Sequence, residues 1–440
     1  MQPLVNLTTN DTDKVLLDRV LDGQLFVVRK SLQQWSLYDL AVERTLKGIR
    51  RTVGDDAAAF VAENGFERIH EVVTLDQLAE MTDAVYRQFA DIAQEFLERY
   101  VPGVFGIHDP FYYERPPNVR FHYPFDLTLA HRKQLADFAK SHGQGKLSAH
   151  APHRDHWLDC PENAVNCWIA LGPVKEGNGL SIFNDNYAKE LEYEEDGNLK
   201  SGTPLSPPTN FALEPGDAVI FHASHVHASE LNSTDQTRYV VSFRLTFGKP
   251  RFPEGHHHEY VHSGLAGAGG VKRLLASVPA YLQKSYAVDR AHRVARKLSG
   301  GPSALTTRNV GPGGGKGAAA NAEVRDEKLA TKGEVSFPLD EIPVGEVRAI
   351  ASDACVARLA ENKFAAFSRH CLHQGADLSC GFLRAEKLHC PWHNLTFDLE
   401  TGASPCQELR ALSIFSCEVR DNRVVVTAAG IEEGRKQKRG

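Results

Sequence analysis

Two features that mark membrane or secreted proteins are missing from this chain. Its first residues, MQPLVNLTTNDTDKVLLDRV, contain no basic segment followed by an apolar run. Nowhere do about 18 apolar residues follow one another without a charge, so no transmembrane helix is predicted. We therefore expect a cytoplasmic protein without a membrane partner.

Cysteine is also scarce, at 8 residues in 440. Cysteines this few and this scattered do not form a disulfide framework. With a net charge of −6 and 24% charged residues, the chain has no bulk attraction to nucleic acid or anionic membrane. An ordinary globular protein remains, and its length allows two or three domains of about 100–200 residues each.

The pattern along the chain predicts a mainly β protein with a helical N-terminal support. Residues 11–101 show mostly helical periodicity, with one strand-like run at 25–28. Residues 118–247 alternate short strand-like runs with turns, which is typical of a sandwich or barrel. Residues 271–298 return to a helical period.

A Gly, Ala and Ser bias at 299–333 is typical of a flexible linker, and short strands resume after it. The predicted organisation is an enzyme-like domain with helical flanks at 1–298, the linker at 299–333, a small all-β domain at 334–430 and a charged tail at 431–440.

Two cysteine and histidine pairs in the last domain have ligand-like spacing. Cys371-Leu-His373 and Cys390-Pro-Trp-His393 are separated by 16 residues. Two thiolates and two imidazoles are the ligands of a [2Fe–2S] cluster in which histidines replace cysteines on one iron. A structural zinc site is the alternative, but such sites usually pair C-x-x-C with H-x₃₋₅-H, whereas each loop here offers one sulfur and one nitrogen.

These loops, with the F-D-x-x-T-G run at 397–402, make residues 335–429 similar to Rieske ferredoxin domains. The resemblance implies a [2Fe–2S] cluster on those four ligands. Asn394 departs from the family, which usually has Gly there, but Asn also tolerates a positive φ. Ala376 and Trp392 stand where the respiratory-complex branch has cysteines, so the domain resembles the ferredoxin branch that feeds oxygenases. The domain's other thiols are expected to be packing or surface residues; they are Cys355, Cys380, Cys406 and Cys417.

A second iron site is predicted upstream. His153 and Asp155 form an H-x-D motif, and His227 follows 72 residues after Asp155. Two histidines and a carboxylate leave three positions open on ferrous iron, as an oxygenase requires. Alternation along a strand would place His153 and Asp155 on one face. By the same alternation His225 competes with His227, while His150 and His156 are expected to line the pocket or the core.

Arg238 follows His227 by 11 residues in a strand-like run, and its planar fork suits a carboxylate. Arg120 and His122 either line the same pocket or serve the structure. With Trp168, Gly179 and the F-H-x₄-H-x-S string at 221–229, residues 105–250 resemble the phytanoyl-CoA hydroxylase family of Fe(II)/2-oxoglutarate oxygenases.

That resemblance implies a double-stranded β-helix, or jelly-roll, barrel. His153, Asp155 and His227 would be the iron ligands, and Arg238 with Ser229 would take the distal carboxylate of 2-oxoglutarate. Trp168 would line the pocket. After Gly179 the family usually continues to a P-G-S-H turn, whereas this chain has SIFNDNY, so the resemblance indicates no substrate.

The expected function is oxidation of a small organic metabolite with 2-oxoglutarate and O₂, with electrons from the Rieske domain. An NAD(P)H-dependent flavoprotein reductase is the expected partner, and the chain is compatible with a homo-oligomer. One alternative is a reductant-driven Rieske-type oxygenase without 2-oxoglutarate, for which Asp217, His222 and His227 would be candidate ligands. In that family, however, the Rieske domain comes first, whereas here it comes last. A non-catalytic redox carrier or sensor is the other alternative.

Overall fold

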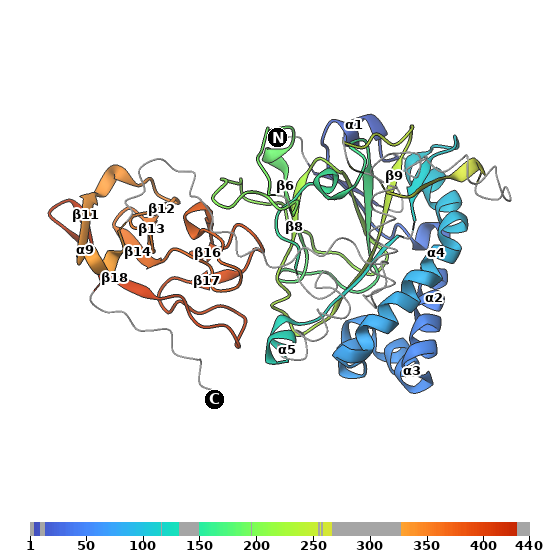
Figure 1. Cartoon of the computed structure of the whole chain (residues 1–440), viewed down its shortest axis with the longest axis horizontal. Coiled ribbons are helices and arrows are strands. Elements are labelled where there is room, and N and C mark those ends of the chain that lie inside the picture. Colours follow the sequence, from blue (N-terminus) through green and yellow to red (C-terminus); the bar gives the residue numbers. More distant parts are fainter. Residues whose placement is uncertain are drawn as a thin grey trace, which may run out of the picture.

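The computed structural model describes residues 4–8, 14–115, 117–131, 149–194, 196–253, 256, 258–265 and 327–428. Two β-rich bodies lie side by side in it, a larger one from the first two thirds of the chain and a smaller one from the last (Figure 1). The predicted helix at 271–298, the linker up to residue 326 and the charged tail lie outside the described residues. No helix within the described residues is long and apolar enough to cross a membrane.

Two sheets form the larger body, which confirms the predicted jelly-roll barrel. One pairs β6 (Leu180–Phe183) with β8 (Val226–Ser229). The other runs in the order β1 (Val5–Leu7), β2 (Phe26–Val28), β7 (Ala218–His222), β5 (Val165–Ala170), β9 (Arg238–Thr246), β3 (Tyr112–Glu114) and β10 (Tyr260–His262), with β4 (Asn118–His122) also paired to β9.

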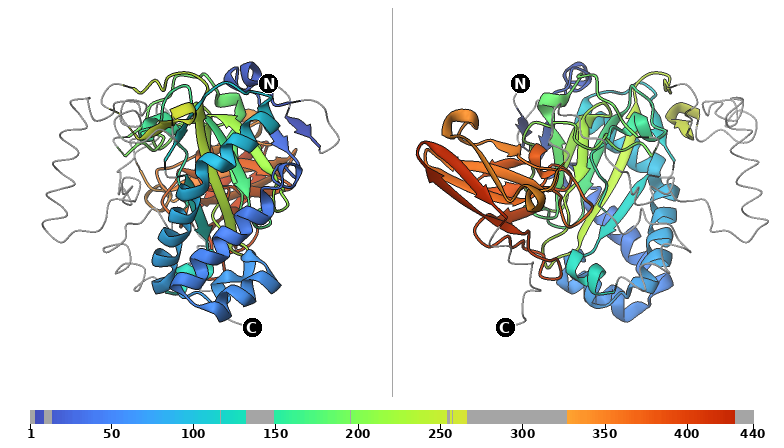
Figure 2. Two further views of the ribbon diagram at one scale, coloured as in Figure 1. Left: turned by 90° about the vertical axis from the view of Figure 1, so that its right-hand side faces the viewer. Right: turned by 60° about the vertical axis from the view of Figure 1, so that its left-hand side comes forward.

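Helices cover the outer face of the larger sheet, as the N-terminal periodicity predicts (Figure 2). They are α1 (Leu17–Leu21), α2 (Tyr38–Thr52), α3 (Asp55–Asn64), α4 (Leu75–Phe105) and, at the barrel rim, α5 (Phe125–Ala130). A capping box of Thr74 and Gln77 begins α4. On this face Phe96 of α4 stacks on Phe243 of β9, with ring centroids 5.0 Å apart, so burial of aromatic surface fixes β9 against the helices.

The inner face of the same sheet carries a row of polar groups on β4 and β9 beside a buried apolar cluster on β5 and β7. Because side chains alternate along a strand, Arg238 and Arg244 of β9 point away from the helices. The register pairs His122 of β4 with Arg238, and Asn118 with Ser242. Four side chains of this face, Asn118, Arg120, Ser242 and Arg244, are partly exposed, whereas their outward-facing strand neighbours are buried. Polar groups on this part of the inner face therefore remain partly accessible to solvent.

The smaller body is the predicted all-β domain. Its larger sheet has the order β11 (Glu334–Pro338), β19 (Arg423–Thr427), β18 (Ile414–Arg420), β14 (Lys363–Ser368), β13 (Ala354–Ala360) and β12 (Val347–Ala349). Its smaller sheet has the order β15 (Phe382–Arg384), β16 (Lys387–His389) and β17 (Thr396–Asp398). Before β11, Leu329 of the short helix α9 (Leu329–Lys332) is buried in the core of this domain. The packed part thus begins before residue 334, inside the segment expected to be linker.

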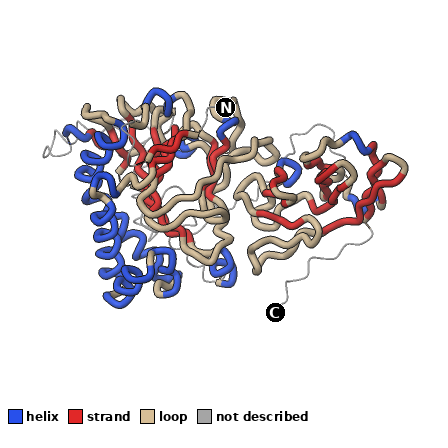
Figure 3. Tube along the Cα trace, turned by 180° about the vertical axis from the view of Figure 1, so that it is seen from behind, coloured by secondary structure: helices blue, strands red, loops and turns tan. Residues whose placement is uncertain are grey.

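The two bodies meet where the loops of the smaller sheet approach the barrel (Figure 3). Ala149 and Leu231 of the barrel are buried in the same apolar cluster as Cys371 and Cys390. Side chains of both domains therefore share one core at this contact.

Candidate metal centres

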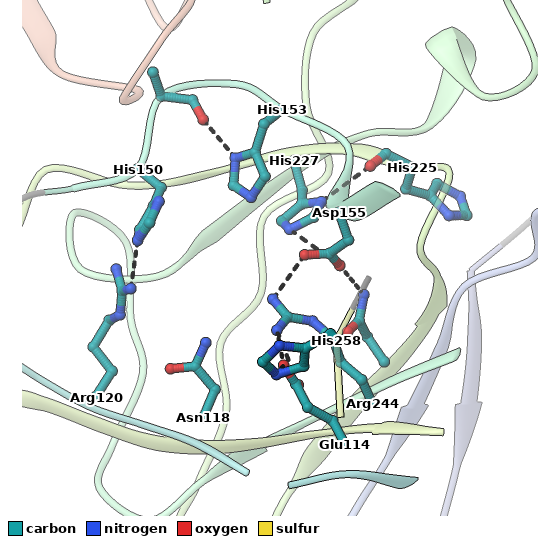
Figure 4. A network of polar contacts seen from close by, with 12 residues as sticks. Glu114, Asn118, Arg120, His150, His153, Asp155, His225, His227, Arg244 and His258 are labelled. Carbon is teal, nitrogen blue, oxygen red and sulfur yellow. Dashed lines mark hydrogen bonds and ion pairs between the residues drawn. The ribbon is translucent and has the colours of Figure 1, made fainter. Parts of the chain in front are cut away.

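Three side chains converge inside the barrel in an arrangement that can hold a metal ion. One potential ligand atom from each of His153, Asp155 and His227 lies within 4.8 Å of the others, and all three residues are buried. The two imidazole rings have centroids 4.4 Å apart, and Nε2 of His227 lies 3.9 Å from Oδ2 of Asp155. Figure 4 shows the three side chains pointing toward one another.

The backbone reaches this geometry by a route that the sequence did not predict. His153 and Asp155 do not share a strand: His153 forms a single bridge with His227, and Asp155 begins the 3₁₀ helix η4 (Asp155–Leu158). In the bridge, the N–H of each histidine donates to the carbonyl of the other, at 3.0 and 2.9 Å. The expected alternation was therefore wrong, and a β-bridge followed by a tight turn brings the pair together.

Hydrogen bonds at Nδ1 leave Nε2 as the nitrogen that His153 and His227 can use to bind a metal. Nδ1 of His153 donates to the Ala151 carbonyl at 2.7 Å, and Nδ1 of His227 donates to the His225 carbonyl at 3.0 Å. With the proton on Nδ1, the lone pair is on Nε2. Burial, reinforced by the neighbouring His227, lowers the pKa of His153 to about 3, so its ring is neutral and able to bind a metal.

Charged and polar side chains hold the Asp155 carboxylate in place. Arg244 donates to Oδ1 at 2.7 Å and Asn166 donates to Oδ2 at 2.5 Å. Behind Arg244, Glu114 accepts from the guanidinium at 3.0 Å and lies 3.1 Å from Nε2 of His258. Although burial favours the neutral acid, the nearby Arg244 keeps the pKa of Asp155 well below its usual range. The carboxylate is therefore charged and fixed in direction (Figure 4).

Sequence reasoning did not identify these supporting residues. Arg244 follows Arg238 by six residues in one strand, so alternation alone would have placed both guanidinium groups on the inner face. Asn166, Glu114 and His258 carried no comparable signal, because they come from separate elements that meet only in the folded chain.

The competing histidines lie outside the triad. The ring of His225 points to other acceptors: its Nε2 lies 3.1 Å from both the Gly23 carbonyl and Oδ1 of Asn184. His150 contacts the guanidinium of Arg120, and its ring lies tilted beside that of His153, with ring centroids 5.5 Å apart. His150 thus lines the inner face beside the triad, as the sequence suggested.

Arg238 and Trp168 lie together on the inner face. The guanidinium of Arg238 lies 5.6 Å from the centre of the Trp168 ring, and its Nη1 donates to the carbonyls of Asn178 and Gly179 at 3.1 and 2.8 Å. Ser229, two residues after His227 on β8, pairs with Leu180, the residue next to Gly179. The predicted residues around Arg238 are therefore brought to one end of the barrel.

In the small domain the four predicted cluster ligands form two adjacent pairs. The thiols of Cys371 and Cys390 hydrogen-bond to each other, and the rings of His373 and His393 have centroids 4.7 Å apart. Nδ1 of His373 and Nε2 of His393 are buried without a partner, and burial lowers the pKa of His373 to about 4. One thiol pair beside one pair of neutral imidazoles fits a [2Fe–2S] cluster with one pair on each iron.

Of the remaining thiols in this domain, Cys355 and Cys406 are buried in its core and Cys380 and Cys417 are partly exposed.

We predict that His227→Ala removes the iron of the barrel but leaves the cluster spectrum unchanged, because the two ligand sets are separate. The matched control is His225→Ala, which should retain the iron. Iron and acid-labile sulfide per chain provide the measurement, with about three irons and two sulfides expected in the intact protein. Loss of iron from the control but not from His227→Ala would show that the ligand is His225.

Two protein-family models match parts of the chain. Residues 45–240 match the family model for phytanoyl-CoA dioxygenase (PhyH), and residues 332–415 match that for the Rieske [2Fe-2S] domain. The first range includes all three triad residues, and the second includes all four cysteine and histidine ligands.

Individual relatives match parts of the chain. The ferredoxin component of naphthalene 1,2-dioxygenase/salicylate 5-hydroxylase systems from Ralstonia sp is 30% identical over 91 residues, which are 20% of this chain and 88% of that protein. Among solved structures, the complex of reduced oxygenase and oxidised ferredoxin in carbazole 1,9a-dioxygenase is 26% identical, with a TM-score of 0.20, over 22% of this chain and 93% of that one. The non-haem monooxygenase ThoJ–Ni complex is 16% identical, with a TM-score of 0.28, over 60% and 90%.

The two matched ranges correspond to the two bodies of the structure. The chain therefore joins a phytanoyl-CoA dioxygenase (PhyH) domain to a C-terminal Rieske [2Fe–2S] domain.

Proposed function

We propose that the chain oxidises a small organic metabolite with O₂ and 2-oxoglutarate, and that its Rieske domain supplies electrons to the barrel iron. The observation that carries the proposal is the buried triad of His153, Asp155 and His227, with ligand atoms within 4.8 Å of one another. Ferrous iron on two imidazoles and one carboxylate keeps open positions for a cosubstrate and O₂. We further propose that the oxygenase domain spans 1–298 and that the linker joins it to a Rieske domain that extends to residue 430 and whose packed part begins at Leu329.

The protein's own residues prepare this site. Arg244 keeps Asp155 ionised and, with Asn166, fixes both of its oxygens. The carbonyls of Ala151 and His225 orient the two imidazoles. Because these contacts exist before any metal binds, the ligands need little rearrangement to accept one.

Arg238 is the best candidate to bind 2-oxoglutarate. Its side chain is 1% exposed, and it forms no ion pair with any residue that the structure describes. Burial lowers its pKa to about 9, and its Nε is buried without a hydrogen-bond partner. A buried cation with unused donors favours an anion, and the distal carboxylate of a dicarboxylate would supply one. Ser229 and Trp168 would complete this end of the pocket.

Electron supply by the Rieske domain is supported by the position of its cluster loops. The carbonyl of His393 accepts a hydrogen bond from the N–H of Leu231 at 3.0 Å, four residues beyond His227. The same contact favours the second candidate, a reductant-driven oxygenase without 2-oxoglutarate. The likeness to a ferredoxin component of dioxygenase and hydroxylase systems supports an NAD(P)H-dependent flavoprotein reductase as the source of electrons.

The assay that separates the two candidates measures cosubstrate use. With the protein purified without oxygen, we expect O₂ consumption to require 2-oxoglutarate and to yield succinate. A reductant should extend activity over many turnovers, because it returns oxidised iron to the ferrous state. O₂ consumption that needs a reductase and no 2-oxoglutarate, with no succinate formed, would favour the second candidate.

Arg238→Gln should raise the 2-oxoglutarate concentration needed for half-saturation at least tenfold, since about 1.5–3 kcal/mol of charge-assisted hydrogen bonding is lost. Arg238→Lys should restore only part of the affinity, because a point charge cannot reproduce the fork. Binding is measured by titration under nitrogen, with the iron content confirmed first. Equal affinity in Arg238→Gln and the unchanged protein would exclude this role.

A further inference from the structure

Asn394, which stands where Rieske domains usually have Gly, has a side chain that links the two bodies. Its backbone φ is +53°, a conformation that Asn tolerates better than other residues with a side chain. Oδ1 accepts from Nδ1 of His389 at 2.8 Å, and Nδ2 donates to Oε1 of Glu230 at 2.9 Å across the interface. A glycine at this position would leave both bonds unmade.

Glu230 is a buried carboxylate, 1% exposed, at the edge of the barrel. Burial raises its pKa, and all the hydrogen bonds described for it come from neutral donors. These are the N–H groups of Gly177 and Gly179 at 2.8 and 3.0 Å, Oγ of Ser181 at 3.4 Å and the amides of Asn210 and Asn394. Loss of one donor therefore leaves a buried acceptor less well satisfied.

The loop that Glu230 holds is the loop that holds Arg238. Gly179 donates its N–H to Glu230, and its carbonyl accepts from Arg238 at 2.8 Å. The contacts thus run without a break from Asn394 through Glu230 and Gly179 to Arg238. A change in the hydrogen bond between Asn394 and Glu230 therefore affects the loop whose carbonyl binds Arg238.

The same interface lies close to the iron ligands in the chain. The N–H of Leu231 donates to the carbonyl of His393, and Leu231 lies four positions after His227, a span of about 13 Å in extended backbone. On the other cluster loop, the ring of His373 meets the edge of Phe125 with centroids 5.0 Å apart. Both cluster loops therefore contact the barrel.

We propose that Asn394 and Glu230 form an interdomain lock. The lock holds the cluster loop against the barrel of the same chain and also fixes the 177–179 loop that positions Arg238. Docking of the Rieske domain and binding at Arg238 are then energetically coupled. The consequence for 2-oxoglutarate rests on the proposed function, whereas the lock itself does not.

The test compares Asn394→Gly with Asn422→Gly in the full-length protein. Asn422 is the matched control, since it also has a positive φ, +60°, and is exposed in the turn between β18 and β19, away from the barrel. Neither glycine strains the backbone, so both variants should keep the cluster spectrum. Amide hydrogen exchange in peptides covering 177–181 and 389–395 should become about tenfold faster in Asn394→Gly and not in the control. Equal amide exchange rates in the two variants would contradict the proposed lock.

A charge swap provides a second test that does not depend on glycine. Asn394→Asp places two carboxylates against each other, so exchange at 177–181 should rise further. Adding Glu230→Gln should reverse this increase, because the amide introduced at position 230 can donate to the carboxylate introduced at position 394. Failure of the double variant to recover protection would contradict the contact.

Coupling to the barrel is measured as the equilibrium affinity for 2-oxoglutarate. Asn394→Gly should weaken it about threefold and Asn422→Gly should not. If Arg238→Gln does not alter the affinity for 2-oxoglutarate, the proposed function is wrong. The amide exchange measurement still shows whether Asn394 and Glu230 form the lock. If Arg238→Gln weakens binding and Asn394→Gly does not, the coupling is wrong and the cosubstrate site stands.

Discussion

The ion pair between Arg244 and Asp155 is the interaction on which the barrel site depends. A carboxylate that is fully buried would ordinarily take up a proton, and a protonated acid is a poor ligand for iron. Arg244 lies 2.7 Å from it and is itself balanced by Glu114 at 3.0 Å. Removing one member of a buried pair typically costs about 3–5 kcal/mol, so the charges behind the triad are part of the metal site.

A short segment after β8 connects this site to the Rieske domain. Residues 227–231 contain His227 of the triad, Glu230 of the lock and Leu231, which bonds to the His393 carbonyl. Alternation turns His227 toward the barrel interior, and the residues beyond the strand reach the cluster loop. One stretch of backbone thus carries a member of the triad and contacts the cluster loop of the Rieske domain.

The sequence predicted the parts of the molecule that local pattern determines. Strand alternation and helical periodicity located β5, β7, β9 and the N-terminal helices. Loop spacing singled out the cysteine and histidine pairs of the small domain, and the H-x-D motif with the family resemblance singled out His153, Asp155 and His227, which the fold brings together. The sequence did not predict features that depend on tertiary contacts. Asp155 lies in a 3₁₀ turn and not in a strand. Leu329 is packed in the core of the small domain although it falls in the expected linker. Asn394 was recognised as a tolerated departure, but its bond to Glu230 joins residues 164 positions apart and has no local signature.

The central claim is that one chain holds an oxygenase iron and a cluster that reduces it directly. The most direct test starts from the oxidised protein under nitrogen, with ferric iron in the barrel, reduces part of the cluster population by a flash in the presence of a photoreductant, and follows the reoxidation of the cluster by its absorbance. Transfer within one chain predicts a first-order rate that stays the same when the protein is diluted tenfold. A rate that falls in proportion to the dilution would show that electrons pass between chains and would contradict the account.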